Sequence, residues 1–207
     1  MLTRRALLAL SACLLGGLSG CSDDSTGPGR EVAPAVQTEP TTIRVIIPRS
    51  FLDFCDLSAA DALEDFSRGD DVAYDAFVEG GDLVLALTDA QHARQVGAWE
   101  DELGERVEAM AADEGVASVE VADDLRGVTV RARPSLVDEP GGPVGDLYVA
   151  VAACGYLQLL DGQEDWGVTV SLIDDGTGVE VARATLPDEE LAIGREAWED
   201  AVGAPGA

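Results

Sequence analysis

Apolar and polar positions alternate along three segments in the first half of the chain, and this two-residue period predicts β-strands. The first segment, residues 43–47, ends at Pro48, which predicts an edge strand. The other two, residues 72–78 and 83–87, lie on either side of Gly80-Gly81. Because paired glycines adopt the positive φ angles of a tight turn, we expect these two segments to form a β-hairpin.

Helical spacing follows directly after this hairpin. Thr88 and Gln91 have the arrangement of a capping box, in which each side chain bonds the backbone amide of the other residue. Gly115 marks the expected end of the helix. A shorter helix is predicted after Ser58, whose hydroxyl can cap the first turn together with Asp61. Five apolar residues of the longer helix recur at spacings of three and four and predict its buried face: Val96, Trp99, Leu103, Val107 and Met110.

One short pattern occurs twice in the second half of the chain. Residues 119–130 and 170–181 each contain a strand, the sequence Asp-Asp-x-x-Gly and a second strand. Asp side chains bond turn amides and Gly accepts a positive φ, so both segments are predicted hairpins in which Gly127 and Gly178 have positive φ. An apolar helix lies between them in residues 147–160, and it is short for a membrane span and expected in the core.

This order of elements predicts an α+β fold, with an antiparallel sheet of β-hairpins and helices packed on one face. Apolar residues make up 46% of the chain, which is enough for one core. A weaker helical pattern in residues 187–202 closes the predicted single domain, residues 41–202. Residues 203–207 are expected to be a disordered tail.

The charge balance narrows the classes of partner. The chain has 207 residues, of which 40 are acidic and 13 basic, and its formal net charge is −27. All the basic residues are arginines, so a Schiff-base lysine and a P-loop lysine are excluded. Nucleic acid is bound by cationic surfaces that release counterions, and a surface this acidic repels it. No nucleic-acid partner is therefore expected.

The amino end has the order of an export signal. Arg4 and Arg5 precede an apolar stretch, residues 6–17, that is too short to be a permanent membrane span. Residues 22–40 are rich in Ser, Thr, Gly, Pro and acidic residues and have no apolar period. This composition predicts a flexible spacer between the signal and the domain.

The residues at the end of this signal, Leu18-Ser19-Gly20-Cys21, resemble the lipobox of bacterial lipoproteins. In that family the Cys sulfur receives a diacylglyceryl group, a peptidase cleaves before the Cys, and the new amino end can be acylated. The resemblance implies a signal peptide of residues 1–20, lipidation at Cys21, and a lipidated spacer of residues 21–40. Two acyl chains anchor a protein stably, which places the domain on the extracytoplasmic face of the cell membrane. An ordinary secretory signal, or a core helix of the folded protein, is the alternative.

Two other segments carry a second resemblance. The run Thr88-Asp89-Ala90-Gln91-His92, with the helix and hairpin after it, and the run from Tyr156 to Gly162 resemble a broad family of uncharacterised envelope lipoproteins from Gram-positive bacteria. The resemblance covers approximately residues 43–186 and implies a lipoprotein with this α+β order. It implies no ligand and no activity.

Two cysteines remain once Cys13 leaves with the signal and Cys21 is lipidated. Cys55 and Cys154 lie on the exported side, where disulfides persist. A bridge between them would close a long loop, and the chain-entropy model gives it about 4–5 kcal/mol of stabilisation. The alternative is a pair of separate buried thiols, since Cys154 lies on an apolar helix face.

No pattern in the sequence assigns a catalytic residue. His92 is the only histidine, it lies at the edge of the apolar stripe of its helix, and no nucleophile motif accompanies it. A structural role is expected for this imidazole. One His and two separated Cys do not make a usual zinc set, and no dinucleotide fingerprint or phosphate-binding glycine loop occurs, so no cofactor is expected.

The weak metal candidates are the acidic pairs of the two predicted hairpin turns, Asp123-Asp124 and Asp174-Asp175. Their oxygen ligands suit calcium, but neither loop fits the EF-hand pattern, and turn formation explains both. The sequence therefore assigns no metal site.

Together these features predict a membrane-anchored, surface-exposed lipoprotein that binds or supports another envelope component, either a protein or a small molecule, without catalysis. The alternative is an exported hydrolase or carbohydrate-active enzyme that uses a carboxylate pair, which a concave pocket with two close carboxylates would favour. A solute-capturing lipoprotein of a transporter is disfavoured, because such proteins are usually two-lobed and longer.

Overall fold

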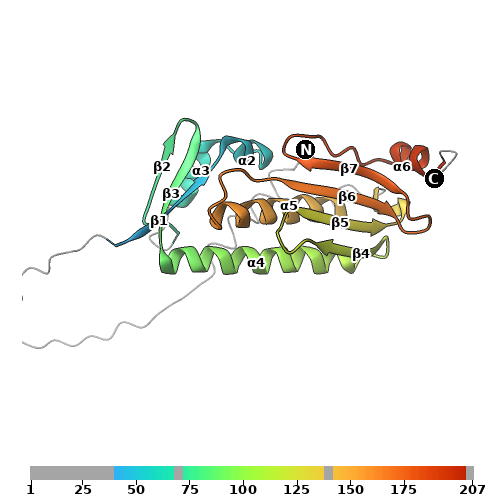
Figure 1. Ribbon diagram of the computed structural model, residues 1–207, viewed down its shortest axis with the longest axis horizontal. Coiled ribbons are helices and arrows are strands. Elements are labelled where there is room, and N and C mark those ends of the chain that lie inside the picture. The colour runs from blue at the N-terminus through green and yellow to red at the C-terminus, as the bar shows by residue number, and fades with distance from the viewer. Residues whose placement is uncertain (1–39, 68–71, 138–141, 204–207) are drawn as a thin grey trace, which may run out of the picture.

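The computed structural model describes residues 40–67, 72–137 and 142–203 (Figure 1). The predicted signal peptide, Cys21, nearly all of the predicted spacer and residues 204–207 lie outside the described residues. The elements follow one another in this order: β1 (Thr42–Ile47), α2 (Arg49–Phe54), α3 (Ala59–Ser67), β2 (Asp75–Glu79), β3 (Asp82–Thr88), α4 (Asp89–Ala111), β4 (Val116–Val121), β5 (Gly127–Ala132), the 3-10 helix η1 (Pro134–Val137), α5 (Pro143–Leu160), β6 (Val168–Asp174), β7 (Glu180–Leu186) and α6 (Arg195–Gly203).

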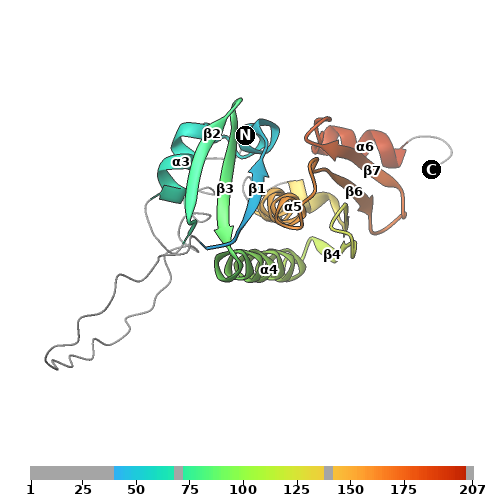
Figure 2. The same ribbon diagram turned by 60° about the vertical axis from the view of Figure 1, so that its left-hand side comes forward.

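The predicted α+β class is confirmed, and the strands of the described residues form two sheets rather than one (Figure 2). The first sheet has the order β1-β3-β2 and is antiparallel. The second has the order β4-β5-β6-β7 and contains one parallel pair, β5 with β6. The chain passes from β5 to β6 through α5, and a helical crossover of this kind joins parallel strands. Both predicted hairpins of the second half, β4–β5 and β6–β7, are present.

Local sequence signals set several element boundaries. Glu79 and Asp82 are paired across the β2–β3 turn, and Gly80 and Gly81 have φ angles of 66° and 103°. β1 lies at the edge of its sheet and ends before Pro48, as predicted. The sequence does not predict α2, which begins directly after this proline, because a six-residue helix is too short to show a helical period.

Both predicted amino-terminal caps are present. The Ser58 hydroxyl donates to the Asp61 carboxylate at 2.7 Å and accepts from the Asp61 amide at 3.1 Å. At the start of α4, the Gln91 amide donates to Thr88 Oγ1 at 3.3 Å, and the Thr88 amide donates to Gln91 Oε1 at 2.9 Å. α4 ends at Ala111, four residues before Gly115 and close to the predicted end.

α5 forms the centre of the core. Figure 2 shows it nearly end-on between the two sheets, with α4 alongside. Fourteen of its residues are buried, on every side of the helix. Within the described part of the chain it is the one helix long and apolar enough to cross a membrane, and 78% of that stretch is buried inside the domain. It is therefore a core helix of the fold.

An aromatic cluster joins α2 and the segment before β6 to α5. The rings of Phe51 and Trp166 meet edge to face with centroids 5.1 Å apart, and Tyr156 lies 5.9 Å from Phe51. Gly155 lies against this cluster, since a Cβ there would lie 2.5 Å from Trp166 Cε3. A side chain at this position is incompatible with the observed packing.

α6 closes the carboxyl end of the domain against β6 and β7. Trp198 is 1% exposed, and its indole Nε1 donates to Asp174 Oδ2 at 2.9 Å. The helix begins at Arg195, so the predicted helical segment from Pro187 is irregular in its first half. Leu191 is buried from that irregular segment rather than from a helix.

Candidate functional site

Both core cysteines are free, buried thiols. Cys55 follows α2 and Cys154 lies within α5, and neither is more than 3% exposed. Burial raises the pKa of each thiol to about 12. The bridge considered from the sequence is not formed in the structure, and the two residues pack as small apolar groups, which was the alternative interpretation.

The two Asp-Asp turns lie at opposite ends of the four-stranded sheet. β5 and β6 are parallel, so the start of β5 lies beside the start of β6. Asp123 and Asp124 precede β5, whereas Asp174 ends β6 and Asp175 follows it. The length of a strand, roughly 17 Å, therefore separates the two turns. The described residues contain no group of three or more His, Cys, Asp or Glu side chains that could hold a metal ion, and the four calcium candidates do not converge.

The second of these turns has a structural role. Asp174 Oδ1 accepts from the Thr177 amide at 2.8 Å and from its hydroxyl at 2.7 Å, while Oδ2 accepts from Trp198. The Trp198 indole, followed by Thr177, holds the pKa of the Asp174 carboxyl below its ordinary value. Gly178 has a φ of 75°, as predicted. This carboxylate closes the turn and holds α6 in place.

The first turn differs from its prediction. Gly127 does not have a positive φ; Leu125 has one instead, at 60°. The turn closes early, because the Leu125 amide donates to the carbonyl of Ala122 at 2.8 Å, and the left-handed position therefore falls two residues before the glycine. The second aspartate, not the first, accepts a backbone bond: Asp124 Oδ1 lies 2.9 Å from the Arg126 amide.

α4 packs against the core with a face that its apolar residues do not predict. Trp99 and Met110 are buried as expected, but the other three residues of the predicted face, Val96, Leu103 and Val107, are only partly buried. The remaining buried residues of this helix are polar: Gln91, Gln95 and Glu102. The helix is thus rotated about its axis from the predicted orientation.

The buried polar side chains of α4 have hydrogen-bond partners, which stabilise this rotated orientation. Gln95 Nε2 donates to the carbonyl of Val72 at 3.2 Å, and its Oε1 accepts from the Tyr156 hydroxyl at 3.3 Å. Glu102 accepts from Arg106 Nε at 2.7 Å, and Arg106 also bonds Asp146 of α5 at 3.1 Å. These hydrogen bonds, led by the one to Glu102, raise the pKa of the Arg106 guanidinium. Because its buried polar groups are satisfied, α4 can leave Val96, Leu103 and Val107 only partly buried against the core.

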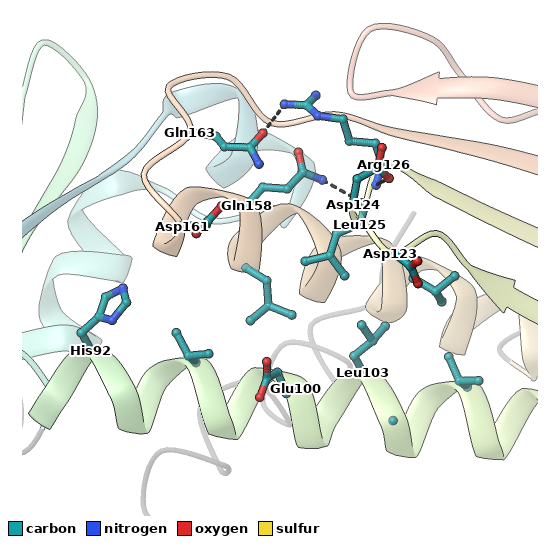
Figure 3. Close-up of a pocket in the computed structure, with 15 residues that line it drawn as sticks. His92, Glu100, Leu103, Asp123, Asp124, Leu125, Arg126, Gln158, Asp161 and Gln163 are labelled. Carbon is teal, nitrogen blue, oxygen red and sulfur yellow. Dashed lines mark hydrogen bonds between the residues drawn. The ribbon is translucent and has the colours of Figure 1, made fainter. Parts of the chain in front are cut away.

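That apolar stripe forms one wall of an open groove of about 870 Å³ (Figure 3). The other walls are the carboxyl end of α5 with the segment after it, and the tip of the β4–β5 hairpin. The apolar lining comes from all three walls: Val96, Leu103, Val107, Val121, Leu125 and Leu157. Its volume lies within the range of small-molecule sites, and most of its lining is apolar, as in such sites.

Gln158 fixes the hairpin tip above the groove. This side chain is 0% exposed, and its Nε2 donates to the carbonyls of Leu125 at 2.9 Å and Gly167 at 3.2 Å. Its Oε1 accepts from the Gly167 amide at 3.2 Å. The side-chain amide of Gln158 therefore holds the strained Leu125 backbone. The Leu125 side chain points into the groove (Figure 3).

The rim of the groove is acidic. Glu100 of α4, Asp123 and Asp124 of the hairpin tip, and Asp161 after α5 all line it. Figure 3 shows Glu100, Asp123 and Asp161 on different sides of the groove rather than meeting as a pair. The single arginine among the lining residues, Arg126, is bonded by its guanidinium to the Gln163 side chain and to the carbonyl of Asp165.

His92 lies at one end of the groove. Its Nε2 is 2.8 Å from the carbonyl oxygen of Leu160, so the imidazole joins the start of α4 to the end of α5. This contact supports the structural role expected for it, although the ring also lines the groove.

No known protein family, curated protein or solved structure matches this chain. The assignment of the site therefore depends on its geometry alone.

Sequence reasoning missed Leu125 and Gln158, and only Gln158 left a signal in the sequence. Gln158 is the one amide in the apolar segment 147–160, and a buried amide in such a helix must bond something outside it.

Proposed function

We propose that this chain is a lipid-anchored binding protein of the extracytoplasmic face and that the groove along α4 is its ligand site. One observation carries the proposal. α4 buries Gln95 and Glu102 in the core and leaves Val96, Leu103 and Val107 on the wall of an open groove. Apolar side chains gathered on a concave surface with a polar rim are typical of a binding site.

The polar groups of the groove favour binding over hydrolysis. Its carboxylates come from three places around the rim, which are α4, the hairpin tip and the segment after α5 (Figure 3). Its imidazole is engaged by the Leu160 carbonyl. A glycosidase of the kind considered from the sequence needs two carboxyl groups that flank one bond. The arrangement therefore supports recognition of a ligand by an apolar surface with charged edges.

The predicted lipid anchor and spacer are consistent with a binding site that is exposed in the envelope. A flexible spacer of the predicted length extends on the order of 20–25 Å from the membrane. The anchor and spacer would hold the groove near the envelope and leave it open to partners there.

A neutral apolar dye tests the proposal. Nile red is titrated into the exported chain, residues 21–207, carrying Cys21→Ser so that no lipid is present. The double variant Val96→Thr/Val107→Thr replaces two groove methyl groups with hydroxyls at nearly constant shape. Since each buried methyl contributes about 0.8 kcal/mol, we expect roughly tenfold weaker dye binding.

The matched control is Val144→Thr/Val202→Thr, two partly buried helix valines outside the groove. Dye binding by this control should equal that of the unsubstituted chain. Equal weakening in both double variants, or saturable dye binding in neither, would contradict the proposal.

A further inference from the structure

We infer that the occupant of the groove is a basic, amphipathic segment of another polypeptide. The inference rests on the proposed function and adds the chemistry of the partner. Three observations on the described residues carry it: the length of the apolar stripe, the acidic rim, and the charge of the chain itself.

The apolar stripe extends along about three turns of α4. The apolar residues of α4 that line the groove run from Val96 to Val107. At the rise of an α-helix this stretch is about 17 Å long. Such a length matches about three turns of a helix laid alongside α4. An amphipathic helix binds a trough of this kind by placing side chains at i, i+3, i+4 and i+7 against it.

The rim selects the charge of the partner. Glu100, Asp123 and Asp161 line the groove, and none of them has an ion pair within the described residues. Arg126 is held by Gln163 and the Asp165 carbonyl. An arriving segment therefore meets an apolar floor between free carboxylates, which complements leucine-like side chains flanked by Arg or Lys.

The predicted spacer does not supply such a segment. Residues 22–39 contain Asp23, Asp24, Glu31 and Glu39 but only one arginine. A second copy of the chain would bring a formal net charge of −27 against an acidic rim. Repulsion between like charges disfavours both occupants, so the partner is a different protein.

The other apolar surface of the domain is less suited to this role. Within the described residues, the exposed large apolar side chains are Ile46, Tyr74, Phe77 and Val78, all in or beside the first sheet. The strand register places Ile46 and Phe77 on either side of Val84, and the Arg44–Glu79 ion pair, 2.6 Å long, crosses this row. Val84 is 2% exposed, so the middle of this surface is already covered.

A fluorescein-labelled synthetic peptide tests the inference by fluorescence anisotropy with the exported chain carrying Cys21→Ser. The peptide has about three helical turns, with leucines at helical spacing and arginines elsewhere. Two further peptides serve as probes: one replaces every arginine by glutamate, and one has the same composition in scrambled order. We expect saturable binding of the first peptide, and no saturable binding of the other two.

Two charge-matched variants locate the binding. Glu100→Gln/Asp123→Asn removes two rim carboxylates, whereas Glu105→Gln/Asp101→Asn removes two exposed carboxylates elsewhere on α4. At low salt the rim variant should bind about fivefold more weakly and the control within about twofold of the unsubstituted chain, since exposed ion pairs are individually weak.

The outcomes separate this inference from the proposed function. Equal effects of the two variants, or equal binding of the scrambled peptide, would overturn the inference. If Nile red binds the groove and the arginine–leucine peptide does not, the partner chemistry is wrong and the binding site stands. If neither binds, both proposals fail.

Discussion

At the residue scale, Leu125 has a backbone conformation that is unusual for its residue type. A left-handed backbone is costly for a side chain with a Cβ, yet this leucine adopts a φ of 60° at the edge of the groove. Its carbonyl is held by Gln158, so the neighbouring helix stabilises the conformation. Backbone strain of this kind is often found at functional sites.

At this position a glycine variant should be more stable than a valine variant, which is the reverse of the usual order for a lost side chain. Leu125→Gly relieves the strain, so its free energy of unfolding should stay within about 1 kcal/mol of the parent despite the lost side chain. Leu125→Val places a β-branched residue at positive φ and should be less stable than Leu125→Gly by roughly 1–2 kcal/mol. Urea unfolding measures both. A valine variant more stable than the glycine variant would contradict the strained conformation.

Asp174 gives a pH-dependent prediction. Its carboxyl pKa is lowered from 3.8, chiefly by the Trp198 indole, so the ionised form stabilises the fold. This contribution is present above pH 3.8 and is lost as the pH falls through the lower native pKa. Asp174→Asn should therefore cost about 1 kcal/mol at pH 6, and its deficit against the parent should shrink at pH 3 and below.

Urea unfolding at the two pH values measures this difference. Asp175→Asn, the exposed neighbour, is the matched control and should show no such change with pH. A deficit of Asp174→Asn that is equal at both pH values would show that ionisation of this carboxyl does not hold α6.

At the scale of elements, the packing of α5 depends on a glycine. Gly155→Ala would bring a Cβ to 2.5 Å from Trp166 and 3.1 Å from Phe51, and overpacking of this kind costs roughly 1–3 kcal/mol. Gly145 lies in the same helix with nothing within 4 Å of its Cβ position. Gly145→Ala should be neutral or stabilising by up to about 1 kcal/mol, since alanine is the better helix former.

Thermal unfolding of the two alanine variants compares them directly. A Gly155→Ala variant as stable as Gly145→Ala would mean that the ring of Trp166 does not pack against α5 as described.

The elements that the sequence predicts well are those decided locally. The Thr88–Gln91 capping box, the Gly80-Gly81 turn and the strand before Pro48 each depend on a few adjacent residues. The α+β class follows from their order. The parallel β5–β6 pair, by contrast, depends on where α5 returns the chain, and the order of hairpins alone does not specify that.

The groove could not be predicted for a related reason. An apolar stripe at helical spacing predicts burial, and the stripe of α4 with Val96, Leu103 and Val107 is only partly buried. Which side of α4 meets the core is decided by partners far away in sequence, such as Tyr156 for Gln95. The left-handed Leu125 is equally non-local, because Gln158 supplies its support.

At the scale of the whole molecule, the proposed anchor precedes the domain. Intact-mass analysis of membrane-expressed protein should show loss of residues 1–20 and a gain of acyl mass on Cys21. Cys21→Ala should release the protein from the membrane or leave it mislocalised, because two acyl chains are needed for stable anchoring. An unmodified amino end at another residue would contradict the lipoprotein proposal.

The groove bordered by α4, α5 and the β4–β5 turn is the binding site that we propose. Two-dimensional ¹⁵N–¹H NMR of the exported chain carrying Cys21→Ser, titrated with the arginine–leucine peptide, locates the bound peptide residue by residue. We predict that the amide shifts concentrate at the groove, with Gly104, Asp123 and Gln163 among the most affected. Shifts concentrated instead on the first sheet around Ile46 and Phe77, or spread evenly over the surface, would contradict the claim.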